Sequence, residues 1–205
     1  MSAIFVSATG TDVGKTFVTT GLIRHFLAGG GVVDAIKPVV SGFDPADLAA
    51  SDPGALLAAL RRPLTLAEVQ RISPWRFAAP LSPDMAAKRE GRAIAFDAVT
   101  DFCRSAMAAR RGHLFIEGIG GIMVPLDANH TVLDLISQLR LPLLLVAGTY
   151  VGTISHTLTA LQVLARRNLD VAAVVVGVFD CGTESTCDKT RGALSCVKPA
   201  RRGVD

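Results

Sequence analysis

The chain has 205 residues, of which 50% are apolar and 19% are charged; its mean hydropathy is +0.42 and its formal net charge is +3. This composition excludes a disordered or fibrous protein, and the length favours a single domain. The charge is too mild to indicate nucleic acid, and no apolar run reaches the ~18 residues of a membrane helix. We therefore expect neither nucleic acid nor a membrane as a partner. The first residues lack the basic segment of a signal peptide, which predicts a cytoplasmic protein.

Short apolar runs rich in β-branched residues alternate with helical patterns along the chain. In chain order we expect strand Ala3–Ala8, helix 15–27, strand 32–40, helix 51–60, helix 82–89, helix 95–110, strand His113–Glu117, strand 141–148, helix 155–166 and strand Val171–Phe179. This order is typical of a mostly parallel sheet covered by helices on both faces.

Local signals set three of these boundaries. Pro38 predicts the end of the second strand near Lys37, because proline cannot donate to a central ladder. Asp52 is the expected cap of the next helix, with Pro53 at its first position. The proline-rich stretch 61–92 is interpreted as a long irregular excursion that contains one helix.

The four cysteines are too few and too unevenly spaced for a disulfide framework. Cys103 lies in an apolar helical stretch, and Cys181, Cys187 and Cys196 lack the spacing of a zinc site. We expect reduced thiols.

Residues 8–16 (Ala-Thr-Gly-Thr-Asp-Val-Gly-Lys-Thr) follow a predicted strand and open a helix, which is the setting of a phosphate-binding loop. Gly14 lets the backbone approach a phosphate, Lys15 can reach the β- and γ-phosphates, and the Thr16 hydroxyl can ligate Mg²⁺. Thr9 stands where the simple template has its first glycine. The alternative is a glycine-rich turn that leads into an ordinary helix.

Two more charged residues stand at the carboxyl ends of predicted strands, where ligands bind in such sheets. Glu117 ends a buried strand and is followed by Gly-Ile-Gly-Gly, which suits an acid that organises magnesium. Lys37 ends the second strand, where burial is costly unless an anion pairs with it. The alternatives are a polar strand end for Glu117 and a surface lysine for Lys37.

Together these segments resemble the dethiobiotin synthetase family. The resemblance is carried by residues 8–16, by Lys37-Pro38-Val39, by residues 117–121 and by residues 151–156 (Val-Gly-Thr-Ile-Ser-His), and residues 76–83 are similar to the family's middle segment. It implies a P-loop NTPase-like, three-layer α/β/α fold. It also implies ATP-dependent closure of 7,8-diaminononanoate and CO₂ (bicarbonate) to dethiobiotin, with Mg²⁺ as cofactor.

The resemblance also assigns site residues. It implies catalytic roles for Thr11, Lys15 and Lys37, nucleotide contacts from Asp12, Val13, Gly14, Lys15, Thr16, Phe17 and Gly177, substrate contacts from Lys37, Ser41, Gly118, Gly120, Gly121, Gly152, Thr153 and Ser155, and magnesium ligation by Thr16, Asp52 and Glu117. The family works as a homodimer with the substrate between subunits, so we expect a homodimer here.

Two departures from the family stand out. Gly177 takes the place of the asparagine that reads the adenine, which leaves base selectivity open. Residues 180–205 turn polar and non-periodic, so we expect a shortened, altered or disordered end to the single domain, with at most a remnant strand at 194–199. Two rivals stay open: a partition-type ATPase of the same loop class, and a nucleotide-binding module without turnover.

Overall fold

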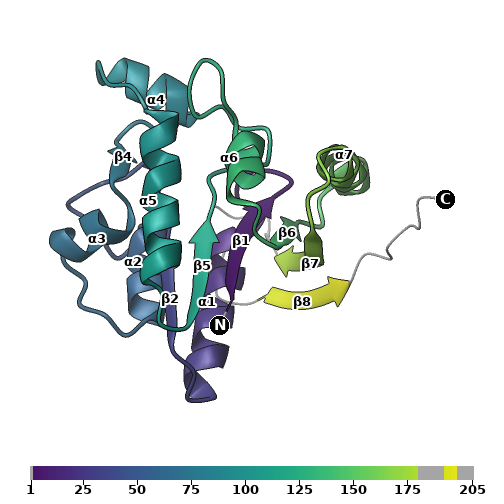
Figure 1. Cartoon of the computed structure of the whole chain (residues 1–205), viewed down its shortest axis with the longest axis horizontal. Helices are drawn as coiled ribbons and strands as arrows, with labels where there is room; N and C mark the ends of the chain where they lie inside the picture. The colour runs from purple at the N-terminus through teal and green to yellow at the C-terminus, as the bar shows by residue number, and fades with distance from the viewer. Residues whose placement is uncertain (1, 180–191, 198–205) are drawn as a thin grey trace.

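The centre of the molecule is a six-stranded sheet with the order β2-β5-β1-β6-β7-β8 (Figure 1). The computed structural model describes residues 2–179 and 192–197. In sheet order the strands are β2 (Val33–Ile36), β5 (His113–Glu117), β1 (Ala3–Ala8), β6 (Leu143–Ala147), β7 (Val171–Phe179) and β8 (Gly192–Val197). The first five pair in parallel and β8 pairs antiparallel to β7. This confirms the predicted α/β class with a mostly parallel sheet.

Helices cover both faces of this sheet. They are α1 (Lys15–Ala28), α2 (Asp52–Ala59), α3 (Leu66–Ile72), α4 (Pro83–Arg89), α5 (Phe96–Ala109), α6 (Val132–Leu139) and α7 (Thr153–Arg166). α1 packs against α2 on one face, and α5 with α6 lies on the other (Figure 1). The strand interiors are fully buried, as at Phe5, Phe115 and Leu145, which is expected when both faces are covered. None of the helices in the described part of the chain is long and apolar enough to cross a membrane.

The predicted strand 32–40 is wrong as a single element. The chain forms β2, breaks at Lys37-Pro38, and continues as β3 (Val39–Ser41), which pairs in parallel with β4 (Trp75–Phe77) in a separate two-stranded sheet. The Lys37 N–H leaves the central ladder and donates to Ile72 O at 3.0 Å. Proline thus separates two strands instead of ending one.

The stretch 61–92 is also more regular than predicted, because it contains α3 and β4 as well as α4. Its prolines lie between these elements and not within them, apart from Pro83 at the start of α4. α6 is a further helix that the sequence patterns did not predict. A reciprocal capping box between Thr131 and Asp134 begins this helix.

The cap of α2 is Ser51, not Asp52. The Ser51 hydroxyl accepts from the Gly54 N–H at 3.1 Å and donates to Leu48 O at 2.7 Å. Asp52 is the first helical residue, and Pro53 follows it. The serine therefore fixes the N-terminus of the helix that carries Asp52.

Gly54 has no room for a side chain, since an added Cβ would lie 1.9 Å from Leu48 O. We predict that Gly54→Ala costs at least about 2 kcal/mol of unfolding free energy through this backbone clash. Gly21→Ala in the middle of α1, where a Cβ meets nothing within 4 Å, is the matched control and should stabilise by about 0.5–1 kcal/mol. Urea unfolding measures both. Equal stability of Gly54→Ala and the parent would contradict the packing at α2.

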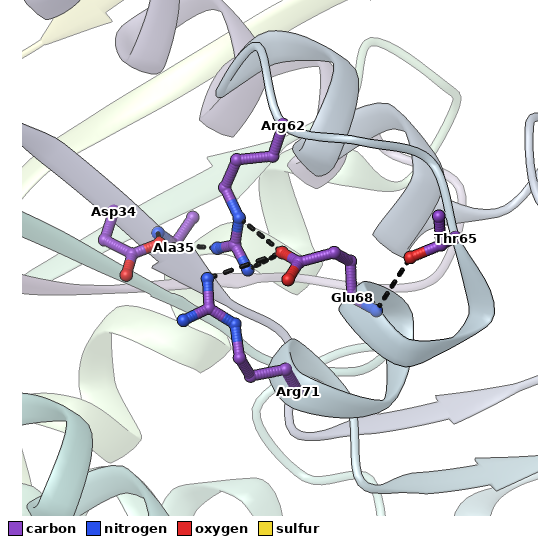
Figure 2. Close-up of polar contacts among 6 residues, drawn as sticks. All are labelled: Asp34, Ala35, Arg62, Thr65, Glu68 and Arg71. Carbon is purple, nitrogen blue, oxygen red and sulfur yellow. Dashed lines mark hydrogen bonds and ion pairs between the residues drawn. The ribbon is translucent and has the colours of Figure 1, made fainter.

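A polar network ties the end of α2 to α3 and β2 (Figure 2). Arg62 donates to Glu68 through Nε at 2.7 Å and also through Nη2, and it reaches Asp34 Oδ1 at 3.1 Å. The hydrogen bonds from Arg62 hold the pKa of Glu68 below its usual value of 4.5. The network fixes the turn that leads the chain from α2 into α3.

The stabilisation from the Glu68 carboxylate should depend on pH. A lowered folded-state pKa means that its contribution is complete above 4.5 and is lost as the pH falls through the folded value. We therefore predict that Glu68→Gln lowers the melting temperature at neutral pH. The difference in melting temperature between the variant and the parent should narrow in acid. Compared with Arg62→Met in place of the parent, the double variant Arg62→Met/Glu68→Gln should show little such narrowing. A gap that is constant with pH would refute the ion pair as its source.

The end of the chain contains one described element. β8 (Gly192–Val197) lies where a remnant strand was predicted at 194–199. The prediction of an altered or disordered end falls mainly on residues 180–191 and 198–205, which lie outside the described residues, as do Cys181 and Cys187. Cys103 is a buried free thiol, and burial raises its pKa to about 12.

Candidate functional site

The loop between β1 and α1 has the geometry of an anion cradle. Gly14 caps α1 with a φ of 93°, a left-handed conformation that favours glycine, and Asp12 also has a positive φ of 56°. The Lys15 side chain is buried and folds back over the loop, where Nζ donates to Gly10 O at 3.1 Å. The loop thus places an ammonium group and a helix N-terminus side by side.

A cluster of four side chains lies beside this loop. Lys37 Nζ donates to Asp52 Oδ2 at 2.6 Å and to Glu117 Oε1 at 2.7 Å. Thr16 Oγ1 donates to the same Glu117 oxygen at 2.7 Å. The four residues come from α1, the β2–β3 junction, α2 and the end of β5, so the fold brings together groups that are up to 101 positions apart.

Burial strengthens the interactions between the charged groups of this cluster. Lys37 is 3% exposed and Glu117 is 0% exposed, whereas the Asp52 side chain is 48% exposed. Burial alone would lower the pKa of Lys37, but the Glu117 and Asp52 carboxylates outweigh it and hold that pKa above its ordinary value. Burial would likewise raise the pKa of Asp52, yet the Lys37 ammonium holds it below its usual range. Lys37 is therefore a fixed cation and Asp52 a fixed anion near neutral pH.

Lys15 has a different setting. Burial, followed by repulsion from the Lys37 ammonium, lowers the pKa of Lys15 to about 8. The hydrogen-bond partner of Lys15 Nζ is the Gly10 carbonyl, in contrast to the two carboxylates held by Lys37. A phosphate near Lys15 would supply the countercharge that this ammonium favours.

The loop and the cluster open into one cavity of about 730 Å³. Ten residues that the sequence analysis singled out line it: Thr11, Asp12, Gly14, Lys15, Thr16, Phe17, Lys37, Ser41, Asp52 and Gly120. Its volume falls in the range of small-ligand sites. Residues from three separate predicted strand ends thus meet at one place.

Other walls of the cavity were not assigned by the sequence analysis. They are Val40, Gly42, Pro80, Leu81, Ser82, Pro83, Ile119 and Val124. Residues 80–83 belong to the stretch 76–83 that resembled the family's middle segment, so a signal for them existed. The pairing of β3 with β4 brings this stretch over the cavity, with Gly42 N–H donating to Ala79 O at 3.1 Å.

Several predicted site residues lie outside the cavity lining. Glu117 lies beneath Lys37 and Thr16 and is completely buried. Val13 is buried in the loop, and Gly177 is buried in β7. The Gly118 N–H already donates to Val6 O at 2.9 Å, so that amide is used within the sheet. Gly121 packs against the backbone of Thr9.

The N-terminus of α7 also lies outside this cavity. Gly152 caps the helix with a φ of 97°, and Thr153 Oγ1 donates to Gly148 O at 2.7 Å. Ser155 is exposed. Within one chain these residues and Lys37 therefore do not line a common cavity.

The residues present fit a magnesium ion. Thr16, Asp52 and Glu117 offer a hydroxyl and two carboxylates, the hard oxygen donors that Mg²⁺ prefers. Glu117 Oε2 is buried and has no hydrogen-bond partner among the described residues. In the described ranges no three His, Cys, Asp or Glu side chains cluster on their own, so the Thr16 hydroxyl is needed to complete a set of three.

Comparison with known proteins places this site in a family. Residues 2–187 match a family model described as an AAA domain. The chain is 50% identical over 181 residues to the ATP-dependent dethiobiotin synthetase BioD of Acidiphilium cryptum, with 88% of this chain and 81% of that protein covered. The chain belongs to the dethiobiotin synthetase family. It is also 52% identical over 177 residues to the BioD of Caulobacter sp. strain K31 (86% and 76% covered) and 40% identical over 180 residues to that of Legionella pneumophila strain Paris (88% and 82% covered).

Membership of the dethiobiotin synthetase family confirms the resemblance drawn from the sequence motifs. The matched part of the chain includes the phosphate loop, Lys37 and Glu117. The roles of the individual residues stay predictions.

Proposed function

We propose that this protein is an ATP-dependent dethiobiotin synthetase that closes 7,8-diaminononanoate and CO₂ into a cyclic urea. The observation that carries the proposal is Lys37 held between Asp52 and Glu117 at the wall of a cavity shared with a phosphate loop. This arrangement suits a reaction in which an anionic carbamate must meet the γ-phosphoryl group of ATP. The names of the relatives support the same activity.

The proposed reaction has three steps. One amine of the diamine attacks CO₂, forms a C–N bond and loses a proton to give a carbamate. A carbamate oxygen then attacks the γ-phosphorus, and the bond from that phosphorus to ADP breaks. The second amine attacks the carbon of this mixed anhydride and loses a proton, phosphate leaves, and the ring closes.

Each cavity residue has a physical part in these steps. Lys37 would neutralise the carbamate and the transferring phosphoryl group, and the Ser41 hydroxyl would donate to the carbamate. Lys15, with the loop residues Thr11–Phe17, would hold the triphosphate, and Gly120 would lie beside the substrate. Thr16, Asp52 and Glu117 would hold Mg²⁺, which when bound neutralises phosphate charge.

We further propose a homodimer with the substrate between subunits. The start of α7 has an exposed apolar face at Val151, Ile154 and Leu158, which suits a protein interface. In such a dimer Gly152, Thr153 and Ser155 of the partner would bind the distal carboxylate at the helix N-terminus. Recovery of activity on mixing Lys37→Met with Gly152→Val, each of low activity alone, would support a shared site; no recovery would count against it.

The test of function is ATP hydrolysis with and without 7,8-diaminononanoate and ¹³C-bicarbonate, with mass detection of the product. We expect phosphate release that needs both substrates, and dethiobiotin labelled at its urea carbon. Phosphate release without the diamine would favour the partition-type ATPase, whose second lysine is missing at Ala8, Thr9 and Gly10. Binding of ATP without any turnover would favour the nucleotide-binding module. Dependence on ATP also supports a cytoplasmic location, which cell fractionation tests.

A further inference from the structure

One ammonium group lies where the three candidate metal ligands meet. Lys37 Nζ is 2.6 Å from Asp52 Oδ2 and 2.7 Å from Glu117 Oε1, and the Thr16 hydroxyl donates to the same Glu117 oxygen. Lys37 therefore does more than line the cavity. It already satisfies the two carboxylates with a positive charge.

A divalent cation at this place would need the same oxygens. Mg²⁺ binds carboxylate oxygens at about 2.0–2.1 Å. An ion that took Asp52 Oδ2 and Glu117 would lie within a few ångströms of the Lys37 ammonium, and like charges at such a distance repel strongly where water is excluded. The two cations compete for one pair of carboxylates.

The two carboxylates differ in how easily they can change partner. Glu117 is fully buried and has a second oxygen, Oε2, with no hydrogen-bond partner among the described residues. It can offer Oε2 to a metal while Oε1 keeps its donors. Asp52 is half exposed at the cavity wall. The contact that must give way is therefore the one between Lys37 and Asp52.

We propose that Lys37 is a built-in competitor for the divalent cation, and that metal binding moves its ammonium from Asp52 toward the cavity beside Ser41. There it keeps Glu117 as a partner but has lost Asp52, so one of its two anionic contacts is open until an anionic group of the substrate arrives. Metal binding thereby turns Lys37 from Asp52 toward the part of the cavity where the substrate would lie. The role toward the substrate rests on the proposed synthetase function, but the exchange of cations does not.

The first experiment measures Mn²⁺ binding by electron paramagnetic resonance, without nucleotide or substrate. Lys37→Met should bind Mn²⁺ at least about tenfold more tightly than the parent, because the competing charge is gone. Lys15→Met is the matched control. Both variants remove one positive charge from the same cavity, but the hydrogen-bond partner of Lys15 Nζ is a backbone carbonyl. The gain in Mn²⁺ affinity should therefore be clearly smaller for Lys15→Met than for Lys37→Met.

Three results would overturn the proposal. They are unchanged or weaker Mn²⁺ binding by Lys37→Met, an equal gain in Lys15→Met, and no Mn²⁺ binding by either the parent or Lys37→Met. The first result would mean that Lys37 holds the carboxylates ready for the metal. The second would mean that Mn²⁺ binding is weakened by the overall positive charge of the cavity and not by the contacts of Lys37 with Asp52 and Glu117.

A second measurement uses the parent protein and covers the case in which Lys37→Met does not fold. The Lys37 ammonium is buried and hydrogen-bonded, so lysine-selective ¹H–¹⁵N NMR of Nζ should detect it. We expect its signal to shift or vanish as Mg²⁺ is added. The midpoint of this change should coincide with the midpoint of Mg²⁺ binding that calorimetry measures. A signal that stays unchanged while Mg²⁺ binds would overturn the proposal. Neither experiment depends on dethiobiotin formation, so failure here is distinguishable from failure of the proposed function.

Discussion

Lys37→Met should slow dethiobiotin formation without weakening the binding of ATP. A preorganised charge at a developing anion contributes at least about 2–3 kcal/mol to the transition state, which corresponds to roughly 30- to 150-fold in rate. Lys37 is buried and hydrogen-bonded to the buried Glu117 carboxylate, so its charge needs little reorganisation. Single-turnover kinetics with labelled bicarbonate, together with ATP titration by calorimetry, separates the two effects.

The control for this variant is Lys88→Met. Lys88 lies exposed on α4 and outside the cavity lining, so the same substitution there should leave both quantities unchanged. Equal rates for Lys37→Met and the parent would refute the role given to Lys37. A large loss of ATP affinity would instead assign Lys37 to nucleotide binding.

Lys15→Ala should remove nucleotide turnover and weaken ATP binding. A charge-assisted hydrogen bond to phosphate is worth about 1.5–3 kcal/mol, which is roughly 10- to 150-fold in the dissociation constant. The Lys15 ammonium is buried beside the loop that would hold the phosphates, and its present partner is the neutral Gly10 carbonyl. Calorimetry with a non-hydrolysable ATP analogue measures the affinity.

The affinity for ATP therefore distinguishes Lys15→Ala from Lys37→Met. Lys15→Ala raises the dissociation constant for ATP, whereas Lys37→Met lowers the rate of the chemical step. Lys15→Arg is a useful companion, since it keeps the charge but changes its geometry. If Lys15→Ala bound ATP as tightly as the parent, the loop would not be the site of the phosphates.

The sheet and the phosphate loop could be predicted because their signals are local. An apolar strand followed by Gly14-Lys15-Thr16 specifies both the turn and the helix that it begins. The predictions near Lys37 failed for the opposite reason. Pro38 indicates that a ladder is broken, but whether the chain then turns or starts a second sheet depends on β4, whose residues pair with β3 from 36 positions further on.

In the candidate site, too, the features with local signals could be predicted and the contacts between distant residues could not. Lys37 and Glu117 could be singled out because each ends a strand, but their contact with each other and with Asp52 joins residues 80 and 15 positions away from Lys37. No periodicity encodes such distances. The position of Asp52 depends on the Ser51 cap and on the close packing of Gly54 against Leu48. α6 was missed because its eight residues are too few for a clear helical period.

The hydrogen bond from Thr16 to Glu117 fixes the orientation of the threonine hydroxyl. Its one hydrogen is given to a buried carboxylate, so the lone pairs of Oγ1 are what remains for any other neighbour. The hydroxyl is thereby fixed as an electron-pair donor. Serine at this position would keep that orientation, whereas valine would have the right shape and nothing to offer a cation. A carboxylate below the loop thus sets, through its hydrogen bond, what the threonine above it can offer a ligand.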